Sequence, residues 1–288
     1  MRRFGPAVVV ALMLAGCGGA APSPTDSGSP SSTNSNGVPT NSGSASPAPT
    51  YSPPPVETKD WVTTIDRRVT KSKYWEEFTY PEFSASKSGN AILDSIVTSL
   101  NEEVATMVAA FKKRAKYDYS HPEGDLPWSP STFYLTGLQE IGSKNLLFIR
   151  MEHNEMAYFE AHGGGATWTE VYDLRTGKRL KLIDQLLADQ KDPFVTLVID
   201  SLVTQVGQDA LDDPQTMWNQ LRSYEDFICW SVADGGLSIT FNEYVVGPYA
   251  SGTPAISIPW QQLVTIVDRK SVLGVEFAPQ LNFVEKTT

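Results

Sequence analysis

Apolar residues in the middle of the chain recur at steps of three and four positions, the spacing that places side chains on one face of an α-helix. The clearest run covers residues 92–111, with Asn90 in front of it as a candidate N-cap. Its apolar positions are Ile92, Leu93, Ile96, Val97, Leu100, Val104, Met107, Val108 and Phe111. A sheet or another helix must cover this face, so the pattern predicts a long amphipathic helix packed on a second layer.

Strand-like segments surround this helix. They are short, rich in β-branched and aromatic residues, and bounded by turn residues. We predict strands or extended segments at 61–69, 80–83, 131–140, 145–161, 167–173, 227–232, 237–243 and 255–258. Between two of them, residues 174–178 predict a hairpin turn in which Gly177 adopts a left-handed conformation.

Helix-like segments of unequal length follow, at 180–187, 192–207 and 214–223 and from Pro259 onward. In the second of these, Asp192 and Pro193 are expected to cap and start the helix. Strands interleaved with such helices lack the regular alternation of parallel βαβ units. The predicted fold class is therefore α+β, an antiparallel sheet with helices packed mainly on one face.

The first 16 residues have the pattern of a secretory signal peptide: Arg2 and Arg3, an apolar run at 7–14, and then small residues. The run is too short to span a bilayer, which needs about 20 apolar residues. The sequence Leu-Ala-Gly-Cys at 14–17 resembles the lipobox of bacterial lipoproteins, in which the cysteine is acylated and becomes the mature N-terminus. We therefore expect Cys17 to anchor the chain to the membrane on its extracytoplasmic side. An ordinary signal peptide with an incidental cysteine is the alternative.

Residues 17–59 follow as a segment built almost entirely from Gly, Ala, Ser, Thr, Pro and Asn. Such a segment buries too little apolar surface to offset its ordering entropy, so we predict a disordered linker. At roughly 35 Å as a flexible coil, it would hold the next domain away from the membrane. A glycosylated or protein-binding proline segment is the alternative for this stretch.

Residues 60–288 have the length and apolar content of a single folded domain. The formal net charge of −10 disfavours nucleic acid as a partner and favours a basic protein ligand. With Cys17 acylated, Cys229 has no second cysteine to pair with. Its apolar neighbours predict a buried thiol within a strand.

Part of this domain carries motifs that resemble a known family. They are the Val-Tyr-Asp-Leu-Arg-Thr-Gly-Lys run at 171–178, the run at 236–252 and the Ile-Ser-Ile-Pro-Trp run at 256–260. These motifs are similar to those of the RsiV-type domain. The best match covers about 148–268, and a companion segment at about 60–145 is similar to the part that precedes this domain in the family.

The resemblance implies an α+β fold of β-grasp-like character. RsiV-type domains form the extracytoplasmic part of lysozyme-sensing anti-sigma factors, and relatives occur in a secreted mycobacterial antigen family and beside peptidoglycan deacetylases. The implied ligand is a lysozyme-type protein or peptidoglycan. Because we expect neither a cytoplasmic domain nor a membrane-spanning helix here, binding is not expected to signal across the membrane through this chain itself.

Catalysis and metal binding have few candidates, namely His121, His153, His162, Glu152, Glu155 and Glu160. The nine-residue separation of His153 and His162 differs from the close spacing of metalloprotease and zinc-finger ligands. The sequence also lacks a nucleophile elbow and a phosphate-binding glycine loop, so we predict no catalytic residue, no metal and no cofactor. Glu155 and Glu160 would act as acid and base only if the fold brought them within several ångströms. A hydrolase or deacetylase-associated enzyme acting on cell-wall glycans is the alternative function.

The best candidate binding surface is the segment from Tyr244 to Gly252. Tyr244 and Tyr249 offer aromatic rings on a backbone constrained by Pro248, which suits a sugar ring or a protein hot spot. His162 is a further candidate, since the family has a histidine in a similar glycine-rich run. Alternatively, the tyrosines pack over the end of the sheet. The sequence thus predicts a membrane-anchored extracytoplasmic lipoprotein whose non-catalytic domain binds or senses a cell-envelope ligand.

Overall fold

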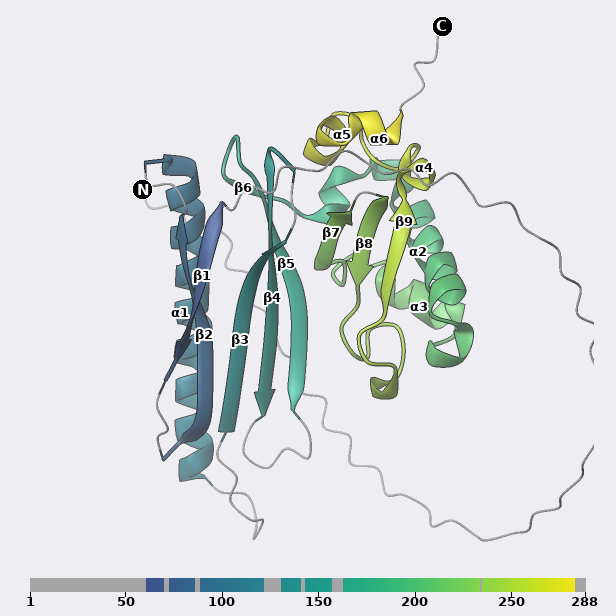
Figure 1. Cartoon of the computed structure of the whole chain (residues 1–288). Coiled ribbons are helices and arrows are strands. Elements are labelled where there is room, and N and C mark those ends of the chain that lie inside the picture. Colours follow the sequence, from purple (N-terminus) through teal and green to yellow (C-terminus); the bar gives the residue numbers. More distant parts are fainter. Residues whose placement is uncertain are drawn as a thin grey trace, which may run out of the picture. The chain divides into compact units, whose positions relative to one another are not determined.

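Figure 1 shows the computed structural model of the chain, which describes residues 61–69, 73–85, 89–121, 131–140, 143–156, 163–233 and 235–282. The chain divides into residues 1–51 and 52–288, and every described residue belongs to the second unit. The predicted signal peptide, the acylated Cys17, the linker up to residue 59 and His162 lie outside the described residues.

A six-stranded sheet forms the first part of this unit, and its strands lie side by side in chain order. They are β1 (Val62–Arg68), β2 (Trp75–Ala85), β3 (Ser131–Glu140), β4 (Leu146–Met156), β5 (Gly164–Asp173) and β6 (Lys178–Arg179). Neighbours are antiparallel except β2 and β3, which are parallel because helix α1 (Ala91–Ser120) carries the chain back between them. The predicted α+β class is confirmed, with this one parallel pair inside a largely antiparallel sheet.

Helix α1 begins where the sequence pattern predicted. The side chain of Asn90 accepts hydrogen bonds from the backbone N–H groups two and three residues later, at 3.1 and 3.2 Å. These are groups that the first helical turn leaves unpaired. The apolar face of the helix packs on the sheet, where Phe111 stacks on Phe78 with ring centroids 5.2 Å apart and lies 4.8 Å from Phe133. This aromatic cluster stands at the centre of the first core.

The face of β3 turned away from α1 is partly open. Phe133 and Leu135 are buried against the helix, whereas Tyr134, Thr136 and Leu138, which alternate with them, point to the other face and are at least partly exposed. Helix α1 therefore covers one face of this sheet, and part of the other face is accessible.

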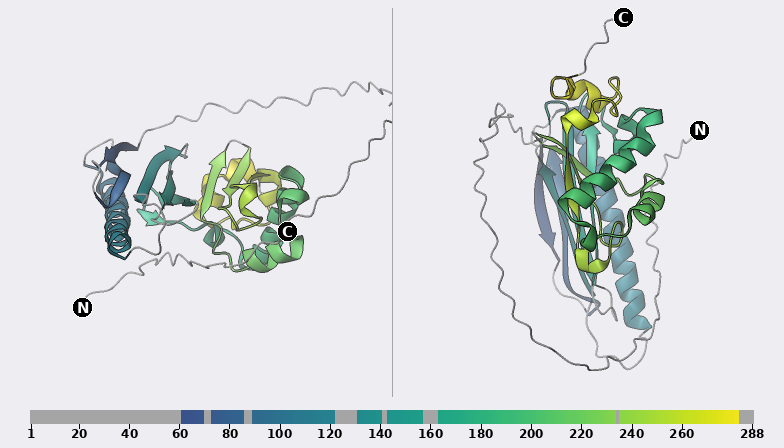
Figure 2. Two further views of the ribbon diagram at one scale, coloured as in Figure 1. Left: turned by 90° about the horizontal axis from the view of Figure 1, so that it is seen from below. Right: turned by 90° about the vertical axis from the view of Figure 1, so that its right-hand side faces the viewer.

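A separate three-stranded antiparallel sheet, with a core of its own, follows in the chain. Its strands are β7 (Cys229–Ala233), β8 (Gly236–Thr240) and β9 (Ala255–Pro259). The helices of this part are α2 (Lys191–Gln205), α3 (Pro214–Leu221), α4 (Trp260–Leu263), α5 (Val272–Glu276), α6 (Ala278–Leu281) and the 3₁₀ turns η1 (Leu182–Gln185), η2 (Ala188–Gln190), η3 (Gln208–Ala210) and η4 (Tyr249–Ser251). The two further views show α2 and α3 beside this second sheet (Figure 2). Cys229 is buried, as predicted, and so is Trp260.

The start of α2 differs from the sequence prediction. Gln190 is its N-cap and makes no side-chain capping bond, so the expectation that Asp192 caps this helix is wrong. Asp192 lies in the first turn, where a negative charge suits the helix dipole, and it accepts a hydrogen bond from the Tyr224 hydroxyl at 2.5 Å. Within the described ranges, no helix combines the length and the apolar character needed to span a bilayer.

The outer edge of β5 joins the two sheets. The Thr169 N–H donates to the carbonyl oxygen of Ile228 at 2.9 Å, and Phe148 of β4 meets Trp230 of β7 edge to face at 5.4 Å. Both rings are buried in the second core, so the first sheet packs against the second. The segment between β8 and β9 bonds to β5 through Asn242 and therefore lies beside the open face of β3 to β5.

Candidate functional site

Residues 241–254, between β8 and β9, form a loop that is fixed at several points. The carboxamide of Asn242 pairs with both backbone groups of Thr167 on β5, at 2.7 Å to N and 3.1 Å to O. The Ser251 hydroxyl donates to the carbonyl of Ala210 at 2.5 Å, and the carbonyl of Val246 accepts from a backbone N–H near α3. The loop is therefore held on both sides, and the side chains on its outer part are presented on a fixed backbone.

Three of the predicted ligand residues lie on this loop. Tyr244 is 59% exposed and Tyr249 is 40% exposed, and their ring centroids are 5.6 Å apart with the rings tilted by 32°. Pro248 is exposed as well. The structure thus brings these residues together at the surface.

The two glycines of the loop have different structural roles. Gly252 has φ = 64°, in the left-handed region that side-chain-bearing residues rarely adopt. Gly247 instead lies close to another backbone segment, because a Cβ atom there would be 2.7 Å from the carbonyl oxygen of Ala210. Both positions determine the loop's shape.

A pocket of about 290 Å³ lies where the open face of β3, β4 and β5 meets this loop. Strand pairing sets Tyr134 beside Asn154, and Thr136 beside Glu152, which in turn pairs with Thr167. Two rows of polar side chains therefore form the floor of the pocket. The lining residues extend from Tyr134 to Thr253, and no local sequence pattern indicates that such distant segments meet.

The loop supplies the other wall of the pocket through Asn242, Glu243 and Thr253. No lysine or arginine is among the lining residues in the described part of the chain. The neighbouring cation, Arg150, is held by Glu152 at 2.9 Å and by Glu140 at 3.7 Å. The charged side chains that line the pocket are therefore the carboxylates of Glu152 and Glu243.

Of the described candidate catalytic residues, Glu152 and His153 are among the lining residues of this pocket, and Glu155 and His121 are not. The His153 ring lies on the face of β4 turned to α1, 5.0 Å from the Phe133 ring, and its Nε2 is 3.3 Å from Glu155 without the geometry of a hydrogen bond. Glu155 is bound by Arg114 at 2.9 Å, and His121 stacks on Tyr117 at the end of α1. The described residues contain no cluster of three or more His, Cys, Asp or Glu side chains that could hold a metal ion. Glu160, like His162, lies outside the described ranges.

A buried carboxylate that the sequence analysis missed lies on β5. Glu170 is 1% exposed, and its Oε1 accepts hydrogen bonds from Trp168 Nε1 at 2.8 Å and from the guanidinium of Arg179. The same guanidinium also donates to Glu103 on α1 at 3.2 Å. Burial outweighs the nearby guanidinium and raises the pKa of Glu170 to about 7. The alternation of Trp168, Glu170 and Tyr172 on one face of a strand was the available signal. Because these side chains link β5, β6 and α1, we assign the cluster a structural role.

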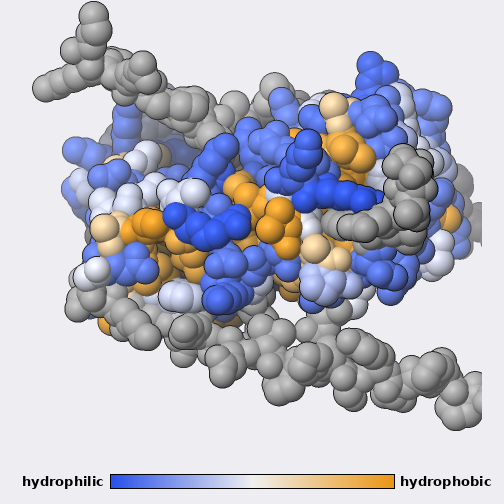
Figure 3. Space-filling view, turned by 90° about the horizontal axis from the view of Figure 1, so that it is seen from above, coloured by the Kyte–Doolittle hydropathy of each residue, from blue (hydrophilic) through white to orange (hydrophobic). Residues whose placement is uncertain are grey.

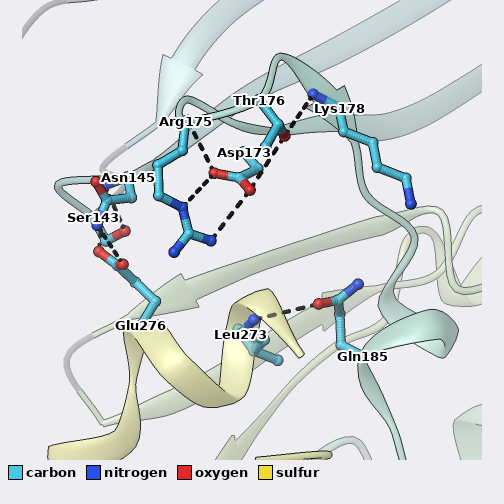
Figure 4. Close-up of polar contacts among 9 residues, drawn as sticks. All are labelled: Ser143, Asn145, Asp173, Arg175, Thr176, Lys178, Gln185, Leu273 and Glu276. Atoms are coloured by element: carbon cyan, nitrogen blue, oxygen red, sulfur yellow. Dashed lines mark hydrogen bonds and ion pairs between the residues drawn. The ribbon is translucent and has the colours of Figure 1, made fainter. Parts of the chain in front are cut away.

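The motif at 171–178, which carries part of the family resemblance, also has a structural role. In the β5–β6 hairpin the Asp173 carboxylate accepts hydrogen bonds from the Arg175 backbone at 3.0 Å, the Arg175 guanidinium at 2.8 Å and the Thr176 hydroxyl at 3.3 Å (Figure 4). Burial alone would raise the pKa of Asp173, but these hydrogen bonds lower it below the ordinary value. Gly177 has φ = 72°, as predicted. The same view shows Glu276 of α5 bound to Asn145 at 2.8 Å, which fixes α5 beside β4.

The face of the molecule seen from above carries exposed apolar side chains that are interrupted by hydrophilic ones (Figure 3). Scattered apolar residues are ordinary on the surface of a folded domain. We therefore retain the tyrosine loop and the adjoining pocket as the candidate site.

Comparison with known proteins gives a family match for the part that contains this loop. Residues 184–261 match the sequence model of the family described as "Protein of unknown function (DUF3298)". A solved structure of a DUF3298 family member from Bacteroides fragilis is similar, with a TM-score of 0.57 at 17% sequence identity, and the match covers 76% of this chain and 97% of that one. A DUF3298 family protein from Pseudomonas aeruginosa gives a TM-score of 0.49 at 20% identity, covering 72% of this chain and 93% of the other.

No curated protein matches the sequence. At 17% identity, the likeness to the Bacteroides fragilis protein shows the fold alone. Because 76% of the chain is far more than residues 184–261, the similarity to the Bacteroides fragilis protein extends beyond the second sheet into the preceding part of the chain.

Proposed function

We propose that this protein is a lipoprotein anchored outside the cytoplasmic membrane through Cys17, and that its folded domain binds a cell-envelope ligand without transforming it. The lipobox-like sequence at 14–17 and the linker-like composition of residues 17–59 support the anchor. The RsiV-type resemblance, with which the DUF3298 match at 184–261 is compatible, supports an envelope ligand: a lysozyme-type protein or peptidoglycan.

The observation that carries the binding role is the exposure of Tyr244 and Tyr249 on a loop fixed at both sides. Buried aromatic rings serve a core, whereas paired exposed rings on a constrained backbone form a surface that loses little entropy on binding. Their exposed fractions of 59% and 40% leave both rings accessible to a partner. The net charge of −10 adds long-range attraction for a basic protein such as a lysozyme.

The test uses the full chain, solubilised in detergent, and two probes: insoluble peptidoglycan, measured by co-sedimentation, and lysozyme, measured by surface binding. Tyr249→Ala should weaken binding to the true ligand by about 2 kcal/mol. Tyr117→Ala is the matched control, since Tyr117 is 61% exposed but lies on α1. Failure of the unaltered protein to bind either probe would contradict the proposal, and release of soluble glycan fragments during the incubation would favour the hydrolase alternative.

A further inference from the structure

We propose that the pocket between the open face of β3 to β5 and the 241–254 loop is a subsite for an N-acetylated amino sugar. This inference rests on the proposed function, because it names the ligand chemistry that the same loop would recognise. It selects a glycan over a protein as the primary ligand.

The size and the floor of the pocket suit a sugar ring. A volume of about 290 Å³ is at the small end for ligand pockets, which favours one or two small rings over a long chain. Tyr134 forms part of the floor and is 37% exposed, so its ring is available to pack on the apolar C–H face of a sugar.

The polar side chains around this floor have unused hydrogen-bonding capacity. Thr136, Asn154, Glu243 and Thr253 line the pocket, and none of these side chains makes a hydrogen bond or an ion pair with another described residue. Two hydroxyls, an amide and a carboxylate together offer both donors and acceptors. Sugar hydroxyl groups are donors and acceptors at once, so they can satisfy all four side chains.

The charges of the pocket exclude an anionic ligand. Its ionisable side chains include the carboxylates of Glu152 and Glu243, and the adjoining guanidinium of Arg150 is already paired with Glu140 and Glu152. A phosphate or a uronic acid would therefore meet like charge without a compensating cation. A neutral sugar is compatible with this environment.

The edge of β5 adds a place for an amide. The outward-facing backbone groups of Thr169 and Thr167 are taken by Ile228 and by the Asn242 carboxamide. Backbone groups along a strand point outward at every second residue, so the next outward-facing N–H and C=O belong to Gly165, which lines the pocket. On the side away from β4, these two groups have no partner among the described residues. An acetamido group has one N–H and one C=O, and can pair with Gly165 as the Asn242 carboxamide pairs with Thr167.

The experiment measures binding of the full chain in detergent to three trisaccharide probes by calorimetry. They are the β-1,4-linked trimer of N-acetylglucosamine, its fully deacetylated form, and cellotriose, which lacks the nitrogen substituent. We expect the acetylated trimer to bind at least about tenfold more tightly than cellotriose, because only the acetylated probe carries the amide. The deacetylated trimer carries ammonium groups that the carboxylates of the pocket attract, so its affinity measures the electrostatic contribution. Soluble peptidoglycan fragments, tested in parallel, distinguish wall glycan from chitin-type glycan as the source of the sugar.

Two variants on the same strand and face provide the residue test. Tyr134→Ala should lower affinity for the acetylated trimer by about tenfold, whereas Leu138→Ala, which removes a 68% exposed side chain outside the pocket, should leave it within about twofold. Thermal melting of both variants checks that the fold is intact. If Tyr134→Ala unfolds, Asn154→Ala gives the same readout.

The outcomes separate this inference from the proposed function. Equal binding of all three probes, or an unchanged affinity in both pocket variants, overturns the sugar subsite. No trimer binding together with retained binding of lysozyme also overturns it and leaves the proposed function standing. Loss of binding to every probe contradicts both proposals.

Discussion

The side-chain amide of Asn101 pairs with both backbone groups of Phe83, accepting from N and donating to O, each at 2.9 Å. Asn101 lies on α1, and Phe83 lies on β2 beyond the point where that strand pairs with β3. The same arrangement recurs at the β5 edge through Asn242 and at the β9 edge, where Gln205 binds Ser257 at 2.9 and 3.0 Å. In each case an amide side chain replaces a missing strand, so it satisfies the backbone and blocks pairing with another chain.

Replacing Asn101 by alanine should destabilise the domain. The change leaves the two backbone groups of Phe83 without partners in a partly buried position, which costs about 1–3 kcal/mol. Urea unfolding measures the change in the free energy of unfolding. Asn219→Ala on α3 is the control, because Asn219 makes its hydrogen bond at an exposed site and should change stability by less than about 0.5 kcal/mol. Equal losses in the two variants would show that the Asn101–Phe83 hydrogen bonds stabilise the fold no more than an exposed hydrogen bond does.

Glu170 should make the protein less stable as the pH rises. Its pKa in the folded chain is about 7, raised by burial from an ordinary value of 4.5. The folded state therefore binds this proton more tightly than the unfolded state, and the resulting stability is fully present below pH 4.5 and is lost as the pH rises through 7. The shift corresponds to about 3 kcal/mol.

Glu170→Gln removes this titration. The variant should show a flatter dependence of unfolding free energy on pH between 5 and 8 and should exceed the unaltered protein in stability at pH 8. Denaturant unfolding at several pH values measures both effects. Glu102→Gln, at an exposed position on α1, should keep the original slope. A variant at position 170 with an unchanged slope would refute the assignment.

Cys229 should be chemically inert in the folded protein. The residue is buried beside Thr169, and burial raises the pKa of its thiol, so little thiolate forms near neutral pH. In the Cys17→Ala variant Cys229 is the one remaining cysteine. A thiol reagent should then react at least about tenfold more slowly under native conditions than in denaturant. Equal rates in the two conditions would place the thiol at the surface.

Cys17→Ser should release the protein from the membrane. Stable attachment needs more than one acyl chain, and the proposed modification of this residue would supply them. Detergent phase partition of the unaltered protein and of the variant measures the change. Ser27→Ala, in the linker, is a control that should keep the membrane fraction unchanged. Retention of the Cys17→Ser variant in the detergent phase, with normal removal of residues 1–16, would exclude the anchor.

Local sequence patterns predict most helices and strands of this fold, but they do not predict which strands pair with one another. The α1 face, the Asn90 cap and the bounds of β3 follow from spacing and capping chemistry over a few residues. The parallel pairing of β2 with β3, and the division of the strands between two sheets, depend on contacts between distant segments. Periodicity does not carry that information.

The candidate site was predictable only in its loop. Tyr244 and Tyr249 lie five positions apart in one segment, so their shared surface could be inferred from the sequence. The pocket needs β3, β4, β5 and the loop together. Glu170 was overlooked because a charged residue in a strand is usually exposed, and its burial depends on Arg179 and α1.

Within the loop, Gly252→Val and Tyr249→Ala should separate backbone shape from ligand contact. A Cβ atom on Gly252 would meet no other atom within 4 Å, so the valine variant creates no steric clash there. Its cost comes from the backbone conformation, φ = 64° and ψ = −133°, which is unfavourable for a residue with a side chain. We expect a loss of about 1–3 kcal/mol from this strain. Ala250→Val, on the exposed part of the same loop, should change stability by less than about 0.5 kcal/mol.

Tyr249→Ala removes a partly exposed ring and should cost less than about 1 kcal/mol of folding stability while weakening ligand binding. Thermal melting and binding are measured on the same preparations. If Tyr249→Ala melts as early as Gly252→Val, the ring supports the fold, and the binding surface loses its central residue.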